Sequence, residues 1–336
     1  MTYTRDTPPT DPARDPARGA NGELLPGDDA EFVAVRAEDD VALTDELPER
    51  LEGRRRRAFM RNIPAMIALV FLVIIVLSAL LAPWLAPLDP NKNELRLNFA
   101  TPWTHCGAET CRVEGLRILG TDDLGRDIFS RLLYASRVSL LVGLGSVLVA
   151  LVISLPLGMV AGYIGGKLDW IMMRIVDIIL SIPPLILVFA VAGVLGASIK
   201  NAIVALGVFF TPLFIRLIRS EVLNLRSSQL VETERAIGVP DRSILIRHVL
   251  PNIASPLIVS VSLNIGTAIL SEASLSFLGL GVQAPTASWG IMLKSAFDFI
   301  SQHPWMILPP SLMIAATVLA LNIIGDGLRD ALGRVR

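Results

Sequence analysis

Six long stretches without a charged side chain divide this sequence, and they limit its fold more than any other feature. They cover residues 63–88, 138–166, 178–199, 201–215, 253–271 and 304–325. A helix needs about 20 mostly apolar residues to cross the hydrocarbon core of a bilayer. Five runs are about that long or longer. The run 201–215 is shorter, but Lys200 and Arg216 at its ends can reach the lipid headgroups. The sequence therefore predicts an all-α polytopic membrane protein with six transmembrane helices.

The N-terminal segment 1–57 has a different composition. Its first 52 residues contain 14 acidic and 5 basic side chains, a net charge of −9, and show little apolar periodicity. This composition is typical of a disordered acidic tail, and the absence of an apolar stretch near the start argues against a signal peptide. The tail ends in the basic cluster Arg54–Arg57, which favours a cytoplasmic N-terminus and contact with anionic lipid. Nucleic acid is not expected as a partner, because a membrane span follows at once.

The charges of the connecting loops agree with that orientation. With the N-terminus inside, six spans bring the C-terminus back to the cytoplasm. The inner loops 166–175, 216–252 and 326–336 then carry 2, 6 and 3 Lys or Arg residues, whereas the short outer segments 195–200 and 276–303 carry one each. Short loops that are rich in Lys and Arg stay inside. The sequence predicts a multi-pass protein of a bacterial plasma membrane with both termini in the cytoplasm.

Residues 58–137 are predicted to form the first transmembrane helix and a long extracellular loop. This loop contains the two cysteines of the chain, Cys106 and Cys111. Thiols outside a bacterial membrane can oxidise, so a local disulfide is predicted, with two free thiols as the alternative. A metal site is not expected, because a fourth ligand is missing. Residues 126–137 have apolar side chains on one helical face and polar ones on the other, which predicts an amphipathic interfacial helix that leads into the second span.

The inner loop 221–251 is the longest connection between spans on the cytoplasmic side. Residues 230–237 can form a short helix, and Gly238 suits a left-handed position at its C-terminal end. Asp241 is placed to cap a second helix over 242–250. A short helix that is fixed by a sharp turn can be held by a soluble partner and can pass movement into the membrane. An ordinary polar connection is the alternative.

The loop resembles the cytoplasmic "EAA" loop of ABC importer permeases, in which a glycine follows an acid by six residues and Leu-Pro comes later. Glu232, Gly238 and Leu250-Pro251 match that pattern. Further matching segments are 120–127, 130–131, 137–140, 181–183, 247–252, 272–281, 285–290 and 322–330, together with Asp177. The resemblance covers roughly residues 60–336, and it is closest to the C-type permease of the dipeptide and oligopeptide (peptide/nickel) family.

The resemblance implies a fold and a set of site residues. The fold is that of a type I ABC importer permease, with residues 138–336 as a five-helix core. The residues implied in ATPase coupling are Glu232, Thr233, Glu234, Arg235, Ala236, Gly238, Arg247, Leu250 and Pro251. Small residues are usual where Thr233 and Glu234 stand here, so the extra carboxylate is expected to alter the pairing with the ATPase.

Three residues at or near span ends are candidates for the gate or the pathway. They are Asp177, Pro183 and Glu272. For Asp177, a hydrogen bond to a serine or to the backbone is the alternative. Glu272 lies near the outer end of the fifth span, where it could help to close an outer gate. His248 and His303 are interpreted as packing residues at the membrane interfaces.

The resemblance also implies a function and partners. The chain would form half of the pathway of an ATP-driven importer for di- or oligopeptides, which works by alternating access. A second homologous permease, two cytoplasmic ATPase subunits that bind ATP and Mg²⁺, and an extracellular substrate-binding protein would complete it. The chain itself has no phosphate-binding loop, since Gly166-Lys167 lacks the earlier glycine and the hydroxyl residue. Nickel or oligosaccharides are alternative substrates. A membrane sensor or enzyme is the alternative class, but it would need a catalytic constellation or a signalling domain.

Overall fold

The computed structural model describes residue 57 and residues 59–106 and 115–333. The elements below all lie within the unit Ala58–Arg336. The acidic tail predicted for the N-terminus falls outside the described residues, apart from Arg57. The predicted disulfide also falls outside them, because Cys111 and the side chain of Cys106 are not described.

The described residues are mostly helical, which confirms the predicted fold class. The longer helices are α2 (Ile63–Leu80), α4 (Ile128–Ile164), α5 (Gly166–Leu180), α6 (Pro184–Leu195), α7 (Ile199–Arg226), α10 (Leu250–Phe277), α11 (Trp289–Asp298) and α12 (Leu308–Gly333). The shorter ones are α3 (Ala82–Leu85), η2 (Leu95–Leu97), α8 (Gln229–Ala236), α9 (Asp241–Ile244), η3 (Leu245–Val249) and η4 (Pro304–Ile307). Five helical stretches of the described chain are long and apolar enough to span a membrane, or six if the bent pair α5 and α6 counts as one.

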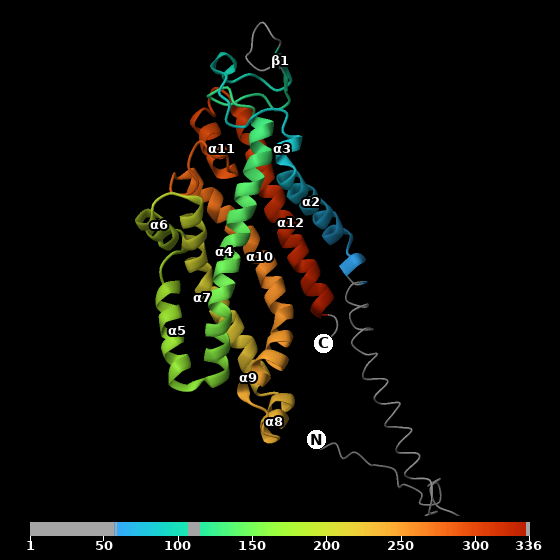
Figure 1. The fold of residues 1–336 in the computed structure, drawn as a ribbon, viewed down its shortest axis with the longest axis vertical. Helices are drawn as coiled ribbons and strands as arrows, with labels where there is room; N and C mark the ends of the chain where they lie inside the picture. Colours follow the sequence, from blue (N-terminus) through green and yellow to red (C-terminus); the bar gives the residue numbers. More distant parts are fainter. Residues whose placement is uncertain (1–56, 58, 107–114, 334–336) are drawn as a thin grey trace, which may run out of the picture. The chain divides into compact units, whose positions relative to one another are not determined.

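The helices pack through small residues. Along the α4–α7 interface, a Cβ atom added at Gly158 would lie 2.8 Å from Cβ of Ile218, and one added at Gly162 would lie 2.9 Å from the carbonyl oxygen of Arg219. Small residues at such positions let two membrane helices approach closely. Helix α10 packs against both α4 and α12, and α2 packs against α12 and α4. Figure 1 shows α8 and α9 at one end of these helices and β1 and α11 at the other.

The segment 126–137 differs from the predicted interfacial helix. From Ile128 onward it is the first part of α4 itself, and Asp127 caps α4 by accepting a hydrogen bond from the backbone N–H of Ser130. The polar side that the sequence placed toward water is buried, because the loop before α4 folds over Ser130 and Arg131. Helical periodicity alone does not distinguish water from a polar protein surface on that side.

The third predicted span is not one straight helix. Helices α5 and α6 are broken between Leu180 and Pro184 and bend by 89°. Proline cannot donate the next helical hydrogen bond, so the helix stops there. The inner loop predicted for residues 166–175 is helical as well. Gly165 and Gly166 have φ angles of 70° and 63°, which reverse the chain directly from α4 into α5.

The loop between α3 and α4 contains a small hairpin. Strand β1 (Thr104–Cys106) pairs antiparallel with β2 (Gly115–Arg117), and Thr104 lies opposite Arg117. The rest of this loop reaches α4 through the bridge between Thr121 and Asp127. The hairpin and α11 lie at the end of the helices that is opposite α8 (Figure 1).

Candidate functional site

Helix α8 ends in a glycine turn, as the sequence predicts. Gly238 has a φ of 84°. The backbone N–H of Val239 donates to the carbonyl oxygen of Glu234, and that of Gly238 donates to the carbonyl oxygen of Arg235, both at 3.0 Å. These two bonds are the Schellman pattern, which requires a left-handed residue at this position. The predicted left-handed conformation of Gly238 is therefore confirmed.

One side of α8 is anchored and the other is open. Val231 is buried in the same apolar cluster as Ile244 and Val249. Leu230 and Ile237, at the two ends of the helix, are 53% and 74% exposed. The remaining exposed residues of α8 and its glycine turn are Gln229, Glu232, Thr233, Arg235, Ala236 and Gly238. A short helix with apolar and acidic groups on its open side is suited to contact another protein.

A cluster of three side chains connects α8 to the end of α4. The hydroxyl of Tyr163, the penultimate residue of α4, donates to Oδ1 of Asp241 at 2.6 Å. Arg235 donates to the Tyr163 oxygen at 3.3 Å, lies 3.5 Å from the Asp241 carboxylate, and has its guanidinium carbon 4.7 Å from the centre of the Tyr163 ring. The hydrogen bond with Tyr163 raises the pKa of Arg235, so this guanidinium stays charged at physiological pH.

The cluster corrects the prediction for Asp241. The structure places Pro240 at the cap and Asp241 in the first turn of α9, with no side-chain cap hydrogen bond. The carboxylate of Asp241 accepts from Tyr163 instead. A residue 78 positions away in the sequence outcompetes the local backbone, and no local pattern could have shown this.

A second contact connects α8 to the start of α10. Nε2 of His248 lies 2.9 Å from Oε1 of Glu234. His248 belongs to η3, a π-helical turn that precedes α10. The carboxylate that the sequence assigns to the ATPase contact is therefore paired within the chain, and the predicted packing role of His248 is incomplete.

Proline explains the position of the π-helical turn. Pro251 does not end the helical path, which continues from Asp241 to Phe277. Pro251 lacks the N–H that would bond the carbonyl oxygen of Arg247, and the wider turn over 245–249 ends two residues before it. The side chains of Arg247 and Pro251 are exposed, whereas Leu250 is half-buried against the core.

Helices α5 and α7 are joined by two ion pairs. Arg216 pairs with Asp177, and Arg219 pairs with Asp169 through both of its carboxylate oxygens. Helix α7 extends to Arg226, past the predicted end of the fourth span at residue 215. The hydrogen bond of Asp177 to a serine or to the backbone, which the sequence left open, is replaced by the pair with Arg216. Pro183 lies in the break between α5 and α6, directly before the first residue of α6.

Glu272 lies at the contact between α10, α4 and α11. Its side chain is fully buried. Ser139 and Ser276 donate to its two carboxylate oxygens at 3.0 and 2.7 Å. The backbone N–H of Trp289 donates to the Ser139 hydroxyl at 3.3 Å, which brings the start of α11 into the same group. Glu272 therefore holds three helices together at the end that carries the hairpin, and a role in a gate there stays a prediction.

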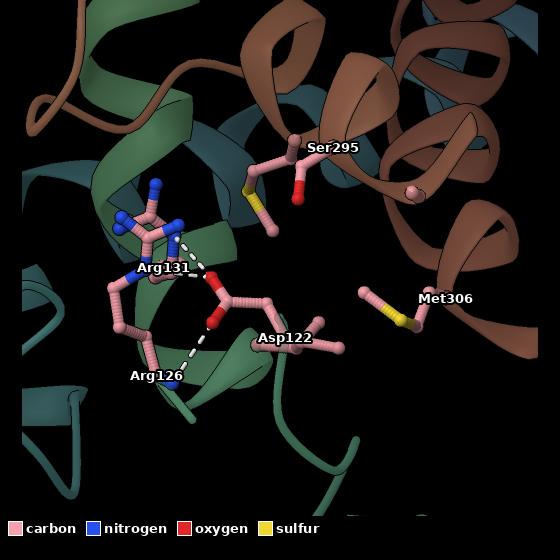
Figure 2. A pocket seen from close by; sticks show the side chains of 8 residues that line it. Asp122, Arg126, Arg131, Ser295 and Met306 are labelled. Carbon is pink, nitrogen blue, oxygen red and sulfur yellow. Dashed lines mark hydrogen bonds and ion pairs between the residues drawn. The ribbon is translucent and has the colours of Figure 1, made fainter. Parts of the chain in front are cut away.

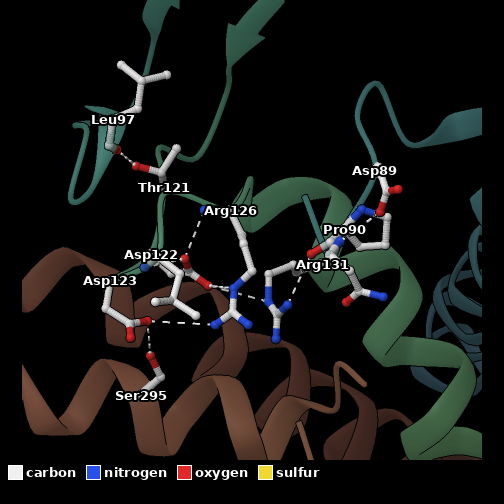
Figure 3. Close-up of polar contacts among 11 residues, drawn as sticks. Asp89, Pro90, Leu97, Thr121, Asp122, Asp123, Arg126, Arg131 and Ser295 are labelled. Atoms are coloured by element: carbon white, nitrogen blue, oxygen red, sulfur yellow. Dashed lines mark hydrogen bonds and ion pairs between the residues drawn. The ribbon is translucent and has the colours of Figure 1, made fainter. Parts of the chain in front are cut away.

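A buried charge network fixes the loop before α4. Asp122 accepts from the backbone N–H groups of Leu124 and Arg126 at 3.0 and 2.9 Å, and from Nε of Arg126 at 2.7 Å. Nε of Arg131 lies 3.5 Å from the same carboxylate, and its Nη1 donates to the carbonyl oxygen of Pro90 at 3.0 Å. Figure 2 shows the Asp122 carboxylate facing both arginines, and Figure 3 shows how the network continues.

The network extends from this loop to α11. The hydroxyl of Ser295 donates to Oδ1 of Asp123 at 2.9 Å (Figure 3). The segment 120–127, which the sequence analysis identified as part of the family resemblance, therefore holds the loop, α4 and α11 together through hydrogen bonds and ion pairs. In the part of the chain that the structure describes, no group of three or more His, Cys, Asp or Glu residues could hold a metal ion.

Comparison with known proteins assigns the family. The family described as binding-protein-dependent transport system inner membrane component matches residues 154–335, more than half of the chain. The chain belongs to this family. A second family, described as the N-terminal TM domain of oligopeptide transport permease C, matches residues 53–102 of this inner membrane component.

Curated relatives of this inner membrane component match most of its length. The di/tripeptide transport system permease protein DppC of Pseudomonas aeruginosa is 41% identical over 82% of the chain and 89% of the relative. DppC of Haemophilus influenzae is 39% identical over 82% and 91%. The glutathione transport system permease protein GsiD of Pectobacterium atrosepticum is 41% identical over 82% and 88%.

A solved structure supports the same fold for this inner membrane component. A chain of the MetNI methionine ABC transporter in an inward-facing conformation is similar with a TM-score of 0.51. It is 21% identical in sequence, and the match covers 60% of this chain and 96% of that one. This likeness concerns the fold alone.

Proposed function

We propose that this chain forms half of the translocation pathway of an ATP-driven importer for di- and oligopeptides. A second homologous permease forms the other half, and an extracellular binding protein delivers the peptide. Two cytoplasmic ATPase subunits hold ATP and Mg²⁺, and one of them contacts the loop 221–251. The observation that carries the proposal is α8: it has an exposed face, a fixed end at Gly238, and side-chain contacts to both α4 and η3.

The peptide as substrate is supported by the relatives. Proteins named for di/tripeptide, dipeptide and glutathione transport are about 40% identical to this chain over more than four fifths of its length. Glutathione is itself a tripeptide. Nickel and oligosaccharide transport have no comparable support among these relatives.

The proposed mechanism is alternating access. ATP closes the two ATPase subunits, and α8 moves with the subunit that holds it. The helices attached to α8 then change their arrangement and open the pathway to the outside. Hydrolysis reverses the change. ATP acts here as a ligand that shifts an equilibrium between two states, and the chain itself performs no hydrolysis.

The proposed orientation places both termini and α8 in the cytoplasm. The basic cluster Arg54–Arg57 precedes α2, and the loop 216–252 contains six Lys or Arg residues. Both features favour the inside. The hairpin β1–β2 and α11 then lie at the outer face, where the binding protein docks.

Reconstitution tests the proposal. The chain is co-expressed with its second permease, ATPases and binding protein, and the complex is placed in liposomes. We expect ATP-dependent uptake of labelled di- or tripeptide, no uptake without ATP, and no ATPase activity of the purified chain alone. Absence of uptake across a panel of peptides from two to five residues, in a complex that hydrolyses ATP, would refute peptides as the substrate.

A further inference from the structure

The contacts of α8 fall into two separate groups, each of which leads to a different helix. The first runs from Arg235 through Tyr163 into the end of α4. The second runs from Glu234 through His248 into η3 and α10. Since Glu234 and Arg235 are adjacent in α8, both groups start within one turn of the same short helix. A displacement of α8 must therefore act on both groups together.

The Tyr163 group is built to resist separation of α8 from α4. Tyr163 is 3% exposed, so its ring is fixed within the core cluster that also contains Val231 and Ile244. Its hydroxyl donates to Asp241 while it accepts from Arg235, and its ring lies below the Arg235 guanidinium. A charged group above an aromatic face adds attraction without needing a specific hydrogen-bond angle. This contact can persist while α8 rotates by a small amount.

The His248 group connects α8 to a weak point of the helical path. Residues 245–249 form a π-helical turn, and such turns are rare and occur mostly as single insertions at functional sites. Pro251, two residues after the end of this turn, prevents a regular α-helical hydrogen bond to Arg247. The turn that carries His248 is therefore the place where α9 and α10 can most easily change their relative rotation.

We propose that Tyr163 and His248 are positioning residues that transmit the displacement of α8 to α4 and to α10, respectively. The inference rests on the proposed function of α8, and it adds two residues that lie outside the EAA-like pattern, as well as a role for Glu234. The pairing of Glu234 with His248 explains why a carboxylate stands where small residues are usual. The effect of Glu234 reaches the ATPase only through the position of α8.

The test measures how much peptide is taken up for each ATP that is hydrolysed. It uses the complete importer in liposomes with three single variants, Tyr163→Phe, His248→Phe and Glu234→Ala, and the double variant Tyr163→Phe/His248→Phe. We expect each single change to lower the ratio about twofold to tenfold, the factor that one net hydrogen bond contributes. The double variant should lower it further, while ATPase subunits still co-purify in normal amounts.

Two control variants carry the same substitutions elsewhere. Tyr134→Phe alters a tyrosine near the other end of α4, whose ring lies 6.0 Å from the Arg137 guanidinium carbon. His303→Phe alters a histidine that stacks on Phe99 in the region of the outer loop. Both controls should keep the ratio of the unaltered importer. The exchanged pair Glu234→His/His248→Glu should recover part of the loss, which a general packing defect would not allow.

A second measurement keeps the inference separate from the proposed function. Hydrogen exchange of the backbone amides of α8, in the purified full chain, should become faster in Tyr163→Phe and His248→Phe and stay unchanged in both controls. If the unaltered importer takes up no peptide, the proposed function is wrong, and the exchange rates still decide whether these residues hold α8. Unchanged exchange, an unchanged uptake ratio in the double variant, or loss of ATPase co-purification in the single variants would each contradict the inference.

Discussion

Replacement of Gly238 by valine should weaken the contact between α8 and the ATPase without preventing the chain from folding. The φ of Gly238 is 84°, and among the described residues no atom lies within 4 Å of a Cβ built there. The penalty is therefore confined to the backbone. A residue with a Cβ atom costs roughly 1–2 kcal/mol in the left-handed region, and a β-branched side chain costs more.

Instead of accepting this strain, the valine at position 238 can leave the left-handed conformation. This breaks the two backbone hydrogen bonds at the end of α8, each of which contributes about 1 kcal/mol. Since the strain and the loss are of similar size, a large share of Gly238→Val molecules should have α8 displaced. Since the Cβ position is open among the described residues, insertion should stay normal.

The assay compares three valine variants in the complete importer. We expect Gly238→Val to reach the membrane at normal levels, to retain less ATPase on purification, and to lose most uptake. Gly166→Val carries the same backbone strain, with a φ of 63° and an open Cβ position, but lies in the α4–α5 turn. Gly193→Val has an open position in α6. Both controls should keep the ATPase bound. Wild-type uptake with normally bound ATPases in Gly238→Val would refute the assignment of this loop.

Three further predictions concern other parts of the chain. Asp122→Asn should lower the free energy of unfolding by about 3–5 kcal/mol, because two buried arginines lose their charged partner. Thermal unfolding in detergent measures this loss of stability, and the control Asp123→Asn should have a smaller effect. Gly158→Val should reduce folded membrane protein by overpacking the α4–α7 interface, and normal yield and melting temperature would contradict that packing. Intact-mass analysis of alkylated membranes should show a Cys106–Cys111 disulfide through a two-proton difference on reduction, and two thiols that alkylate without reductant would reject it.

Features that depend on neighbouring residues could be predicted from the sequence. The apolar runs identify most of the spans, and Gly238 followed by Pro240 identifies the end of α8, because both signals act within one or two turns of helix. The sequence also identifies the segment 120–127 through the family resemblance. Its contacts with α4 and α11 depend on Arg131 and Ser295, which the sequence did not connect with it.

Features that depend on pairs of helices could not be predicted. Asp177 is close to Arg216 only because α5 and α7 lie side by side, 39 residues apart in the chain. Asp241 turns to Tyr163, and Glu234 turns to His248, for the same reason. In each case the sequence shows the charged residue but does not show which distant residue pairs with it. The Glu234 carboxylate, which was expected to alter the pairing with the ATPase, is paired with His248 within the chain.

Helix α4 runs from the buried charge network to the cluster at α8 without an intervening loop. It has 37 residues, which at 1.5 Å per residue gives a length of about 55 Å. Arg131 near its first turn belongs to the buried charge network, and Tyr163 near its last turn belongs to the α8 cluster. A rigid tilt of about 5° around the middle of such a helix moves its two ends by roughly 2–3 Å in opposite directions. The loop before α4 and helix α8 are thus attached to opposite ends of one helix, so a tilt of α4 moves both, and Pro156 inside α4 is the position where a kink would uncouple them.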